Sequence, residues 1–354
     1  MKADSPLSPE DMKHVLDGTR DLWPEMKDCR VLVTGATGFF GRWIMESLLA
    51  ADARHALNLR VVALSRNPGA FLGRVPHLGD PRVTWLTGSV VDLVPGALGG
   101  GRVDAVIHLA TEADLQASAA NAGAAAAVIT EGTRRALEVA AHCQARRFLF
   151  ASSGAVYGRQ PAGLPLIPES HPGRPDPSDG SPYGPSGEAK RKAELLCSAR
   201  AAQDGLGAVI ARCFTFAGPA LPLDGKFAFG NFMGDALDGV AVRVKGDGSP
   251  VRSYLYAADL AVWLWTLLLQ GDPGRAYNVG SEQPLTLLEL AERIAGELGG
   301  KGVEVLGKPV PGKAPDRYLP STLRARTELG LKEYFHLSEM IRRTAAWHRP
   351  PVKR

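Results

Sequence analysis

The sequence predicts an α/β protein built on a doubly wound parallel sheet, with a smaller C-terminal α/β region. Short apolar runs alternate with helical patterns over the first 160 residues, which is typical of βαβ units. A glycine-rich turn directly follows the first apolar run. The chain has 354 residues, of which 45% are hydrophobic and 22% are charged, so it can bury a large core.

The first strand and helix enclose a loop that suits a dinucleotide. Residues 31–33 predict a buried strand and residues 42–50 predict a helix. Of the three glycines between them, the first permits a tight turn, the second lets the backbone approach a diphosphate, and the third lets the helix pack close to the sheet. The helix N-terminus offers unpaired N–H groups to the anion. The residues expected to contact the cofactor here are Gly35, Thr37, Gly38, Phe39, Phe40 and Gly41.

The end of the second expected strand, residues 60–64, indicates which dinucleotide binds. NAD-binding folds place an acidic side chain about 20 residues after the glycine loop, where it binds the ribose 2′-hydroxyl. This chain has Ser65 and Arg66 there and no acid. Because a guanidinium pairs with a 2′-phosphate and the serine can add a hydrogen bond, the sequence favours NADP, with NAD as the alternative.

The remaining apolar runs extend the sheet toward a reaction site. Further strands are expected at residues 83–86, 105–109 and 148–151, with a helix at 117–142. In open α/β sheets, ligands bind beyond the carboxyl ends of the strands. Ser152 and Ser153 follow the last of these runs. We therefore expect them where a substrate would meet the cofactor.

Composition excludes several other classes of function. The net charge of +4 is small for this length and no Lys/Arg cluster is dense, so no nucleic-acid partner is expected. The four cysteines show no pairing or metal spacing, so we expect no metal and a reducing compartment. No apolar run reaches membrane-spanning length and the N-terminus lacks a signal-peptide pattern. The expected location is cytoplasmic, without a membrane partner.

Motifs over most of the chain resemble those of the extended short-chain dehydrogenase/reductases, specifically the nucleotide-sugar epimerase/dehydratase family. Residues 34–41 match the pattern TGxxGxxG and residues 152–158 match SSxxVYG. Five further segments of this chain resemble other motifs of the family: residues 106–110, 212–219, 245–260, 276–280 and 317–326. The resemblance implies a Rossmann fold, a nicotinamide cofactor and a nucleotide-diphosphate sugar as substrate. It also implies a homodimer formed through helices at 117–142 and 186–203.

The resemblance also divides the chain. Residues 1–29 are expected to be an N-terminal extension, with Ser8 capping a short helix. Residues 30–160 are the Rossmann core, and 161–354 are mainly the substrate-binding region, in which 186–217 and 250–280 return partly to the core. Eight prolines between positions 161 and 185 exclude a helix or a central strand there.

The chemistry implied by the resemblance uses a serine, a tyrosine and a lysine. The tyrosine takes the proton of a sugar hydroxyl while the nicotinamide takes the hydride. A lysine one helical turn later lowers the pKa of the tyrosine through its positive charge. By motif, Ser153 is the serine, since it lies four residues before the tyrosine of the VYG segment.

The tyrosine–lysine pair is irregular, and three alignments stay open. One keeps Tyr183 but puts Gly187 at the lysine position. Another keeps Lys190 but puts Ser186 at the tyrosine position. The third, which we favour, keeps Tyr183 and Lys190 with a three-residue insertion, the glycines and proline between them bending the chain. The expected catalytic residues are then Ser153, Tyr183 and Lys190. Altered or lost redox chemistry is the alternative.

The residues after Ser153 narrow the reaction. By resemblance, 4,6-dehydratases carry an Asp-Glu pair there to eliminate water, and glucuronate decarboxylases keep the Glu. This chain has Gly154 and Ala155, which can do neither job. Glu112 could supply a carboxylate, although a loop acid or helix cap is the simpler interpretation. Small residues at these positions are similar to those of epimerases and 4-ketoreductases.

The resemblance assigns further ligand contacts. The cofactor set is extended by Ser65, Arg66, Ser89, Val90, Leu109, Ala110 and Lys190. The substrate set is Ser153, Thr215, Asn231, Arg252 and Arg317. The two arginines match residues that hold the diphosphate, and guanidinium groups fit phosphate oxygens bidentately.

The sequence therefore predicts an NAD(P)-dependent nucleotide-sugar 4-epimerase or 4-keto-sugar reductase. The first alternative is a nucleotide-sugar dehydratase or decarboxylase with atypical acid/base residues. An alternative of another class is a non-catalytic NADP-binding sensor or scaffold, which the irregular spacing at Tyr183–Lys190 would suit.

Overall fold

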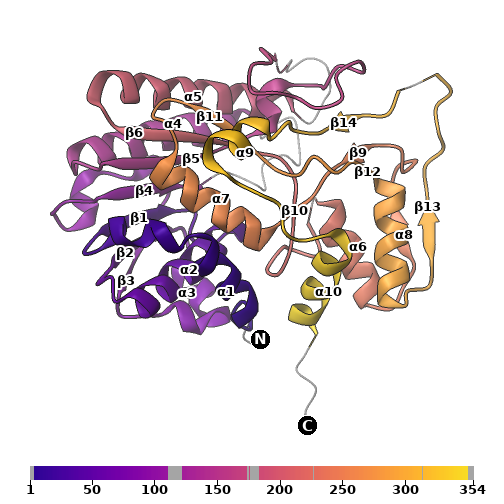
Figure 1. The fold of residues 1–354 in the computed structure, drawn as a ribbon, viewed down its shortest axis with the longest axis horizontal. Coiled ribbons are helices and arrows are strands. Elements are labelled where there is room, and N and C mark those ends of the chain that lie inside the picture. Colours follow the sequence, from indigo (N-terminus) through magenta and orange to yellow (C-terminus); the bar gives the residue numbers. More distant parts are fainter. Residues whose placement is uncertain are drawn as a thin grey trace, which may run out of the picture.

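A parallel sheet of seven strands organises the chain (Figure 1). The computed structural model describes residues 4–110, 122–173, 175, 183–225, 227–312 and 314–349. In the sheet the strands are ordered β11-β6-β5-β4-β1-β2-β3. Their bounds are β1 Arg30–Thr34, β2 Arg60–Ser65, β3 Val83–Thr87, β4 Ala105–His108, β5 Arg147–Ser153, β6 Gly207–Cys213 and β11 Ala276–Val279. The order reverses between β1 and β4, which opens a crevice at their carboxyl ends. The predicted doubly wound α/β fold is confirmed.

Alternate residues of each strand feed two cores on the two faces of the sheet. On β1, Val31 and Val33 enter one core, together with helices α1 (Pro9–Gly18), α2 (Phe39–His55) and α7 (Ala257–Gln270). Leu32 enters the other, beneath α4 (Ala122–His142) and α5 (Gly184–Asp204). This alternation follows from the two-residue period of a strand. Figure 1 shows α4 and α5 together over one face of the sheet.

The expected elements of the first 160 residues are present with small shifts in their ends. The predicted helix at 42–50 begins earlier, at Phe39, because Gly38 serves as its N-cap. The N-terminal helix is capped as expected, since Ser8 Oγ accepts a hydrogen bond from the Asp11 amide. Of the helix expected at 117–142, the structure describes Ala122–His142.

The C-terminal region is built from short pieces beside the main sheet (Figure 1). Three small sheets pair β12-β9-β14, β13-β8 and β10-β7. The strands are β7 Phe216–Ala217, β8 Val242–Val244, β9 Val251–Arg252, β10 Leu255–Tyr256, β12 Leu285–Thr286, β13 Val303–Val305 and β14 Arg317–Tyr318. The helices are α6 Ala228–Leu237, α8 Leu287–Leu298, α9 Leu323–Leu329 and α10 Leu337–His348, while α3, Pro68–Arg74, belongs to the first half.

The register of β14 on β9 positions the candidate site. The two strands run parallel, with Tyr318 opposite Arg252. An isolated bridge joins Ile167, in the segment after β5, to Pro320, which follows β14. Residues far apart in sequence therefore meet beyond the carboxyl end of β5.

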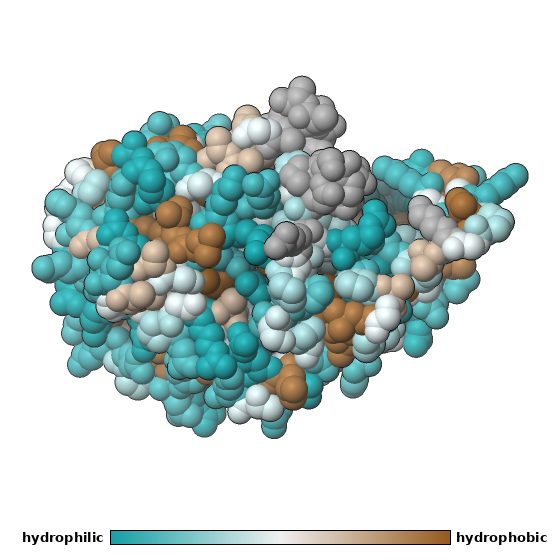
Figure 2. Space-filling model, turned by 90° about the horizontal axis from the view of Figure 1, so that it is seen from above, coloured by the Kyte–Doolittle hydropathy of each residue, from teal (hydrophilic) through white to brown (hydrophobic). Residues whose placement is uncertain are grey.

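The face in Figure 2 is mostly hydrophilic, and its hydrophobic residues fall into several separate groups. Among the described residues, no helix combines the length and the apolar character needed to cross a membrane.

Candidate active site

The glycine loop between β1 and α2 has the geometry of a phosphate cradle. Gly35 adopts a φ of 71°, and a Cβ there would lie 2.7 Å from the Ala110 amide nitrogen. A Cβ on Gly41 would lie 2.2 Å from the Gly35 carbonyl oxygen. Any larger residue would therefore push α2 away from the loop. No side chain caps the N-terminus of α2, so its amides remain available to an anion. These features fit a dinucleotide diphosphate.

The end of β4 closes one side of this cradle. Thr34 Oγ1 accepts a hydrogen bond from the Ala110 amide at 3.3 Å and lies 2.7 Å from His108 Nδ1. Burial lowers the pKa of His108 to about 3, so its imidazole is neutral. The close approach of Gly35 to Leu109 and Ala110 places these two residues directly beside the loop, and their contacts with a cofactor stay a prediction.

The end of β2 lies on the other side of the cradle. Ser65 is buried, and its Oγ lies 3.4 Å from Thr37 Oγ1 and accepts a hydrogen bond from the Asn67 amide. Arg66 is exposed. Ser89 is the N-cap of the 3₁₀ turn η3, Val90–Asp92. Thr37 and Ser65 are thus brought together.

Val90 lies under α4. A Cβ on Gly132 of that helix would be 2.5 Å from Val90 Cγ1, so the two elements pack closely. On the glycine loop, Phe39 and Phe40 are partly buried, and the ring of Phe40 meets Phe216 at 5.0 Å between centroids. The loop is therefore braced by the C-terminal region.

A serine and a lysine meet the carboxyl end of β5. Ser153 ends the strand, and its Oγ accepts a hydrogen bond from the Ala155 amide at 3.2 Å. Lys190 on α5 is buried, and its Nζ donates to the carbonyl oxygen of Ala151 at 2.6 Å. Burial lowers the pKa of Lys190 to about 8. The structure therefore brings two of the expected catalytic residues to the same strand end.

The expected bend between Tyr183 and Lys190 is wrong. Helix α5 runs without interruption from Gly184 to Asp204, because a proline is tolerated in the first helical turn. Lys190 therefore lies one turn after Ser186, and Tyr183 precedes the helix as its N-cap residue. The third alignment does not describe this geometry.

Tyr183 has partners in the C-terminal region. Its hydroxyl donates to Asp316 Oδ2 and accepts from Arg252 Nη2, both at 3.1 Å. Burial raises the pKa of Tyr183 to about 12, and the Arg252 cation opposes that effect. In these contacts Tyr183 meets neither Ser153 nor Lys190.

The position after Ser153 is filled by aromatic rings. A Cβ on Gly154 would lie 2.7 Å from both Phe214 Cζ and Tyr318 Oη. Tyr318 Oη itself lies 3.3 Å from Ser153 Oγ. Motif reasoning missed Tyr318 and Asp316, although both fall in or beside the 317–326 segment. The β14–β9 register places Tyr318 opposite Arg252, and the Ile167–Pro320 bridge ties the same segment to the chain after β5. Glu112 lies outside the described residues.

The expected substrate residues divide into two groups. Arg252 donates to Asp316 Oδ2 at 2.7 Å, and Arg317 follows on β14 with a buried Nε that has no hydrogen-bond partner. Thr215 donates its hydroxyl hydrogen bond to the Ser253 carbonyl oxygen. Asn231 lies on α6, partly buried. Arg252 and Arg317 lie on β9 and β14, and Thr215, which precedes β7, contacts the residue after β9. Asn231 lies apart from them on α6, and Ser153, the fifth expected residue, ends β5.

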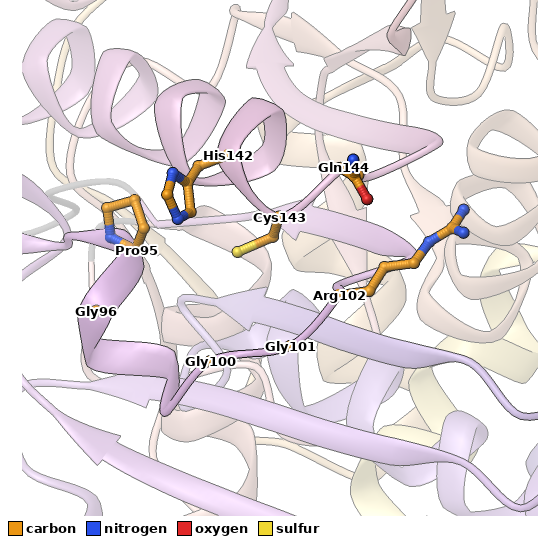
Figure 3. Close-up of a pocket in the computed structure, with 8 residues that line it drawn as sticks. All are labelled: Pro95, Gly96, Gly100, Gly101, Arg102, His142, Cys143 and Gln144. Carbon is orange, nitrogen blue, oxygen red and sulfur yellow. The ribbon is translucent and has the colours of Figure 1, made fainter.

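A separate hollow lies at the opposite edge of the sheet (Figure 3). It is lined by Pro95, Gly96, Gly100, Gly101, Arg102, His142, Cys143 and Gln144. Arg102 precedes β4 and Gln144 precedes β5, so this hollow is at the amino ends of the strands. It is therefore not part of the candidate active site.

The sheet, the cradle at its switch point, and the serine and lysine at β5 define a dinucleotide-dependent enzyme of the extended short-chain dehydrogenase/reductase class. The chain belongs to the NAD dependent epimerase/dehydratase family, whose model matches residues 31–280. Relatives of this chain are named for reactions of nucleotide-sugars.

Curated relatives span almost the whole chain. A dTDP-glucose 4,6-dehydratase of Streptomyces niveus is 28% identical over 330 residues, which cover 90% of this chain and 93% of the relative. A UDP-glucuronic acid decarboxylase of Xenopus tropicalis is 28% identical over 332 residues, covering 92% of this chain and 73% of the relative. Enzymes with different reactions are thus equally similar to it.

A solved structure agrees with the fold and bears on the cofactor. The dTDP-glucose 4,6-dehydratase DesIV of Streptomyces venezuelae, solved with NAD bound, is 28% identical with a TM-score of 0.75. The similarity covers 90% of this chain and 96% of that one. The preference for NADP expected from Arg66 therefore has no support from this neighbour, which supports the NAD alternative.

Proposed function

We propose that this chain is a nucleotide-sugar 4-epimerase or 4-keto-sugar reductase that works with NAD. The observation that carries the proposal is the end of β5. Ser153 is followed by Gly154 and Ala155, and the space beside Gly154 is taken by Phe214 and Tyr318. No carboxyl group is hydrogen-bonded to Ser153 among the described residues. Elimination of water needs both an acid and a base at these positions, whereas hydride transfer needs only one group that donates or takes the proton of the sugar oxygen.

The residues fit bound NAD and a diphosphate sugar in defined roles. The Gly35–Gly41 loop and the α2 N-terminus take the cofactor diphosphate. Ser153 hydrogen-bonds the sugar oxygen, and Lys190 is held near the end of the same strand by its hydrogen bond to the Ala151 carbonyl oxygen. When bound, the nicotinamide accepts or supplies hydride at the sugar carbon. Arg252, which is opposite Tyr318 in the β9–β14 register, binds the substrate diphosphate. Arg317 is opposite Val251, so its side chain leaves the other face of this strand pair.

A dehydratase or decarboxylase is the second candidate, because the relatives named above include both. Such a reaction would use acids other than those at positions 154 and 155. A non-catalytic dinucleotide-binding protein would bind the cofactor but no nucleotide-sugar.

One experiment separates these candidates. The purified protein is incubated with UDP- and dTDP-hexoses, hexuronic acids and 4-keto sugars, with and without NADH, and the sugar products are identified by mass and NMR. An epimerase returns a product of unchanged mass without net use of NADH. A reductase consumes NADH stoichiometrically. Loss of water or of carbon dioxide overturns the proposal, and absence of both turnover and nucleotide-sugar binding identifies a non-catalytic protein.

We also propose a homodimer through α4 and α5. The two helices lie side by side, and a shallow hollow between them is lined by Ala126, Ala127, Thr130, Pro185, Glu188, Ala189 and Lys192. Leu195 of α5 is 71% exposed. A second copy that packs on this face would cover this leucine, and the molar mass in solution tests it.

A further inference from the structure

The serine at the end of β5 meets a phenol that comes from another part of the chain. Tyr318 Oη lies 3.3 Å from Ser153 Oγ. Among the described residues, Tyr318 is the one ionisable side chain hydrogen-bonded to this serine. Any sugar oxygen held by Ser153 would therefore lie within reach of the Tyr318 hydroxyl.

The ring of Tyr318 is fixed by its surroundings. It stacks on Tyr183 with centroids 5.1 Å apart and an interplanar angle of 13°, and it packs on Phe214 at 4.6 Å. Its side chain is 6% exposed, and the guanidinium carbon of Arg252 lies 5.9 Å from the ring centroid. A rigid, nearly buried hydroxyl of this kind is suited to positioning one substrate atom.

Gly154 is what lets the phenol reach Ser153. A Cβ at this position would be 2.7 Å from Tyr318 Oη, closer than van der Waals contact allows. An acidic residue at position 154 would occupy the space of the Tyr318 hydroxyl. The lack of an acid after Ser153 and the phenol beside this serine therefore have the same structural cause. A larger residue at position 154 would displace the hydroxyl.

We propose that Tyr318 is the catalytic acid/base of this site, sharing one sugar oxygen with Ser153. In carbonyl reduction, the O–H bond of Tyr318 breaks and its proton joins the sugar oxygen. A bound reduced nicotinamide would supply the hydride for the new C–H bond. The sugar carbonyl is reduced to an alcohol, the cofactor is oxidised, and the phenolate regains a proton from water. In the reverse direction Tyr318 takes the proton.

The electrostatic setting favours the acid form. Burial raises the pKa of Tyr318, while its hydrogen bond to Ser153 opposes the rise. At neutral pH the phenol carries its proton and can donate it. This inference rests on the proposed function: the protonated phenol is the form that reduction of a 4-keto sugar requires, whereas oxidation of a sugar alcohol would require Tyr318 to lose its proton first.

The first test removes one oxygen atom. Tyr318→Phe keeps the stacked ring and is expected to lower kcat by about 100-fold or more, the usual scale for general acid catalysis. Isothermal titration is the second readout: in the NAD-loaded protein, Tyr318→Phe is expected to lose part of the affinity that the sugar of UDP-glucose or dTDP-glucose adds over UDP or dTDP. The matched control is Tyr334→Phe, since Tyr334 is 59% exposed and lies outside the site.

The second test uses Gly154→Ala, which keeps the inference open to refutation should Tyr318→Phe fold poorly. Alone it should lower kcat, and in the Tyr318→Phe background its further effect should be small, since the hydroxyl it displaces is already gone. The inference is overturned if kcat or the sugar contribution to affinity is unchanged in Tyr318→Phe, or if the two losses simply add. If the wild-type protein turns over no nucleotide-sugar at all, the proposed function itself fails, which is a different outcome.

Discussion

Arg252 and Asp316 form an ion pair of 2.7 Å within the segment where the substrate diphosphate is proposed to bind. The same carboxylate accepts a hydrogen bond from Tyr183, and Arg159 lies 3.8 Å from its other oxygen. A diphosphate that binds Arg252 must therefore compete with Asp316 for the guanidinium.

This competition predicts opposite effects from two substitutions. Arg252→Ala should weaken binding of UDP or dTDP by about 10- to 100-fold, the scale of charged hydrogen bonds. Asp316→Asn should tighten binding several-fold, because the competing negative charge is removed. Isothermal titration of the NAD-loaded protein measures both.

The control for this pair is Arg243→Ala. Arg243 is paired with Asp235 on an exposed surface and should not affect nucleotide binding. Weaker binding in Asp316→Asn would show that Asp316 helps to build the diphosphate site.

Substitution of Gly41 by alanine is expected to abolish NAD binding. The Cβ of Gly41→Ala would lie 2.2 Å from the Gly35 carbonyl oxygen, so the loop and α2 must separate. We expect NAD binding to be lost, as followed by titration calorimetry. Gly73→Ala is the matched control, since a Cβ there has open space and Gly73 is also helical. Equal NAD affinity in both variants would refute the assigned cradle.

The buried Lys190 predicts a pH dependence of stability. Burial lowers the pKa of its ammonium from an ordinary 10.5 to about 8 in the folded chain. Between these values the unfolded chain holds a proton that the folded chain has released, so the free energy of unfolding rises with pH. Lys190→Met should lack this contribution.

Urea denaturation at a series of pH values measures the effect. From about pH 8 to 10, the free energy of unfolding of the wild type should rise relative to that of Lys190→Met, because the charge penalty is relieved only in the wild type. Lys301→Met, at an exposed lysine outside the active site and the proposed dimer face, should parallel the wild type. A constant difference between wild type and Lys190→Met would contradict the assigned pKa.

Arg66, at the end of β2, allows a prediction of the relative affinities for NAD and NADP. Because NAD is the proposed cofactor, Arg66→Ala should leave the dissociation constant of NAD unchanged. If Arg66 instead contacts a 2′-phosphate, wild type should prefer NADP and the variant should lose that preference. Parallel titrations with NAD and NADP decide between these results.

The proposed dimer predicts a change in molar mass. Leu195→Glu places a charge on the exposed face of α5 and should yield monomers in light scattering after size exclusion. Leu323→Glu, at a leucine on α9 that is 56% exposed, should remain dimeric. A wild-type monomer would refute the interface.

The fold and the cradle could be predicted because their signals are local. The glycines of β1–α2 and the apolar runs at β2 to β5 specify their elements within a few residues. The expected bend between Tyr183 and Lys190 was wrong. It assumed that both residues take the tyrosine and lysine positions of the family, whereas Pro185 lies in the first turn of an unbroken helix.

The contacts of Tyr318 and Asp316 could not be predicted from motifs. They depend on the parallel register of β14 with β9 and on the space left by Gly154, which is far away in sequence. The sequence showed that Gly154 replaces the acid that dehydratases carry at this position. Only the three-dimensional structure shows that this glycine leaves space for the Tyr318 hydroxyl.

The central claim is that this site transfers hydride to or from a nucleotide-sugar without eliminating part of the sugar. The most direct measurement follows the sugar products of wild-type protein by mass spectrometry, using UDP- and dTDP-sugars, their 4-keto forms and NADH deuterated at the transferred position. We predict a product of unchanged mass, or a 4-hydroxy sugar that carries the deuterium. A product that has lost water or carbon dioxide would contradict the account.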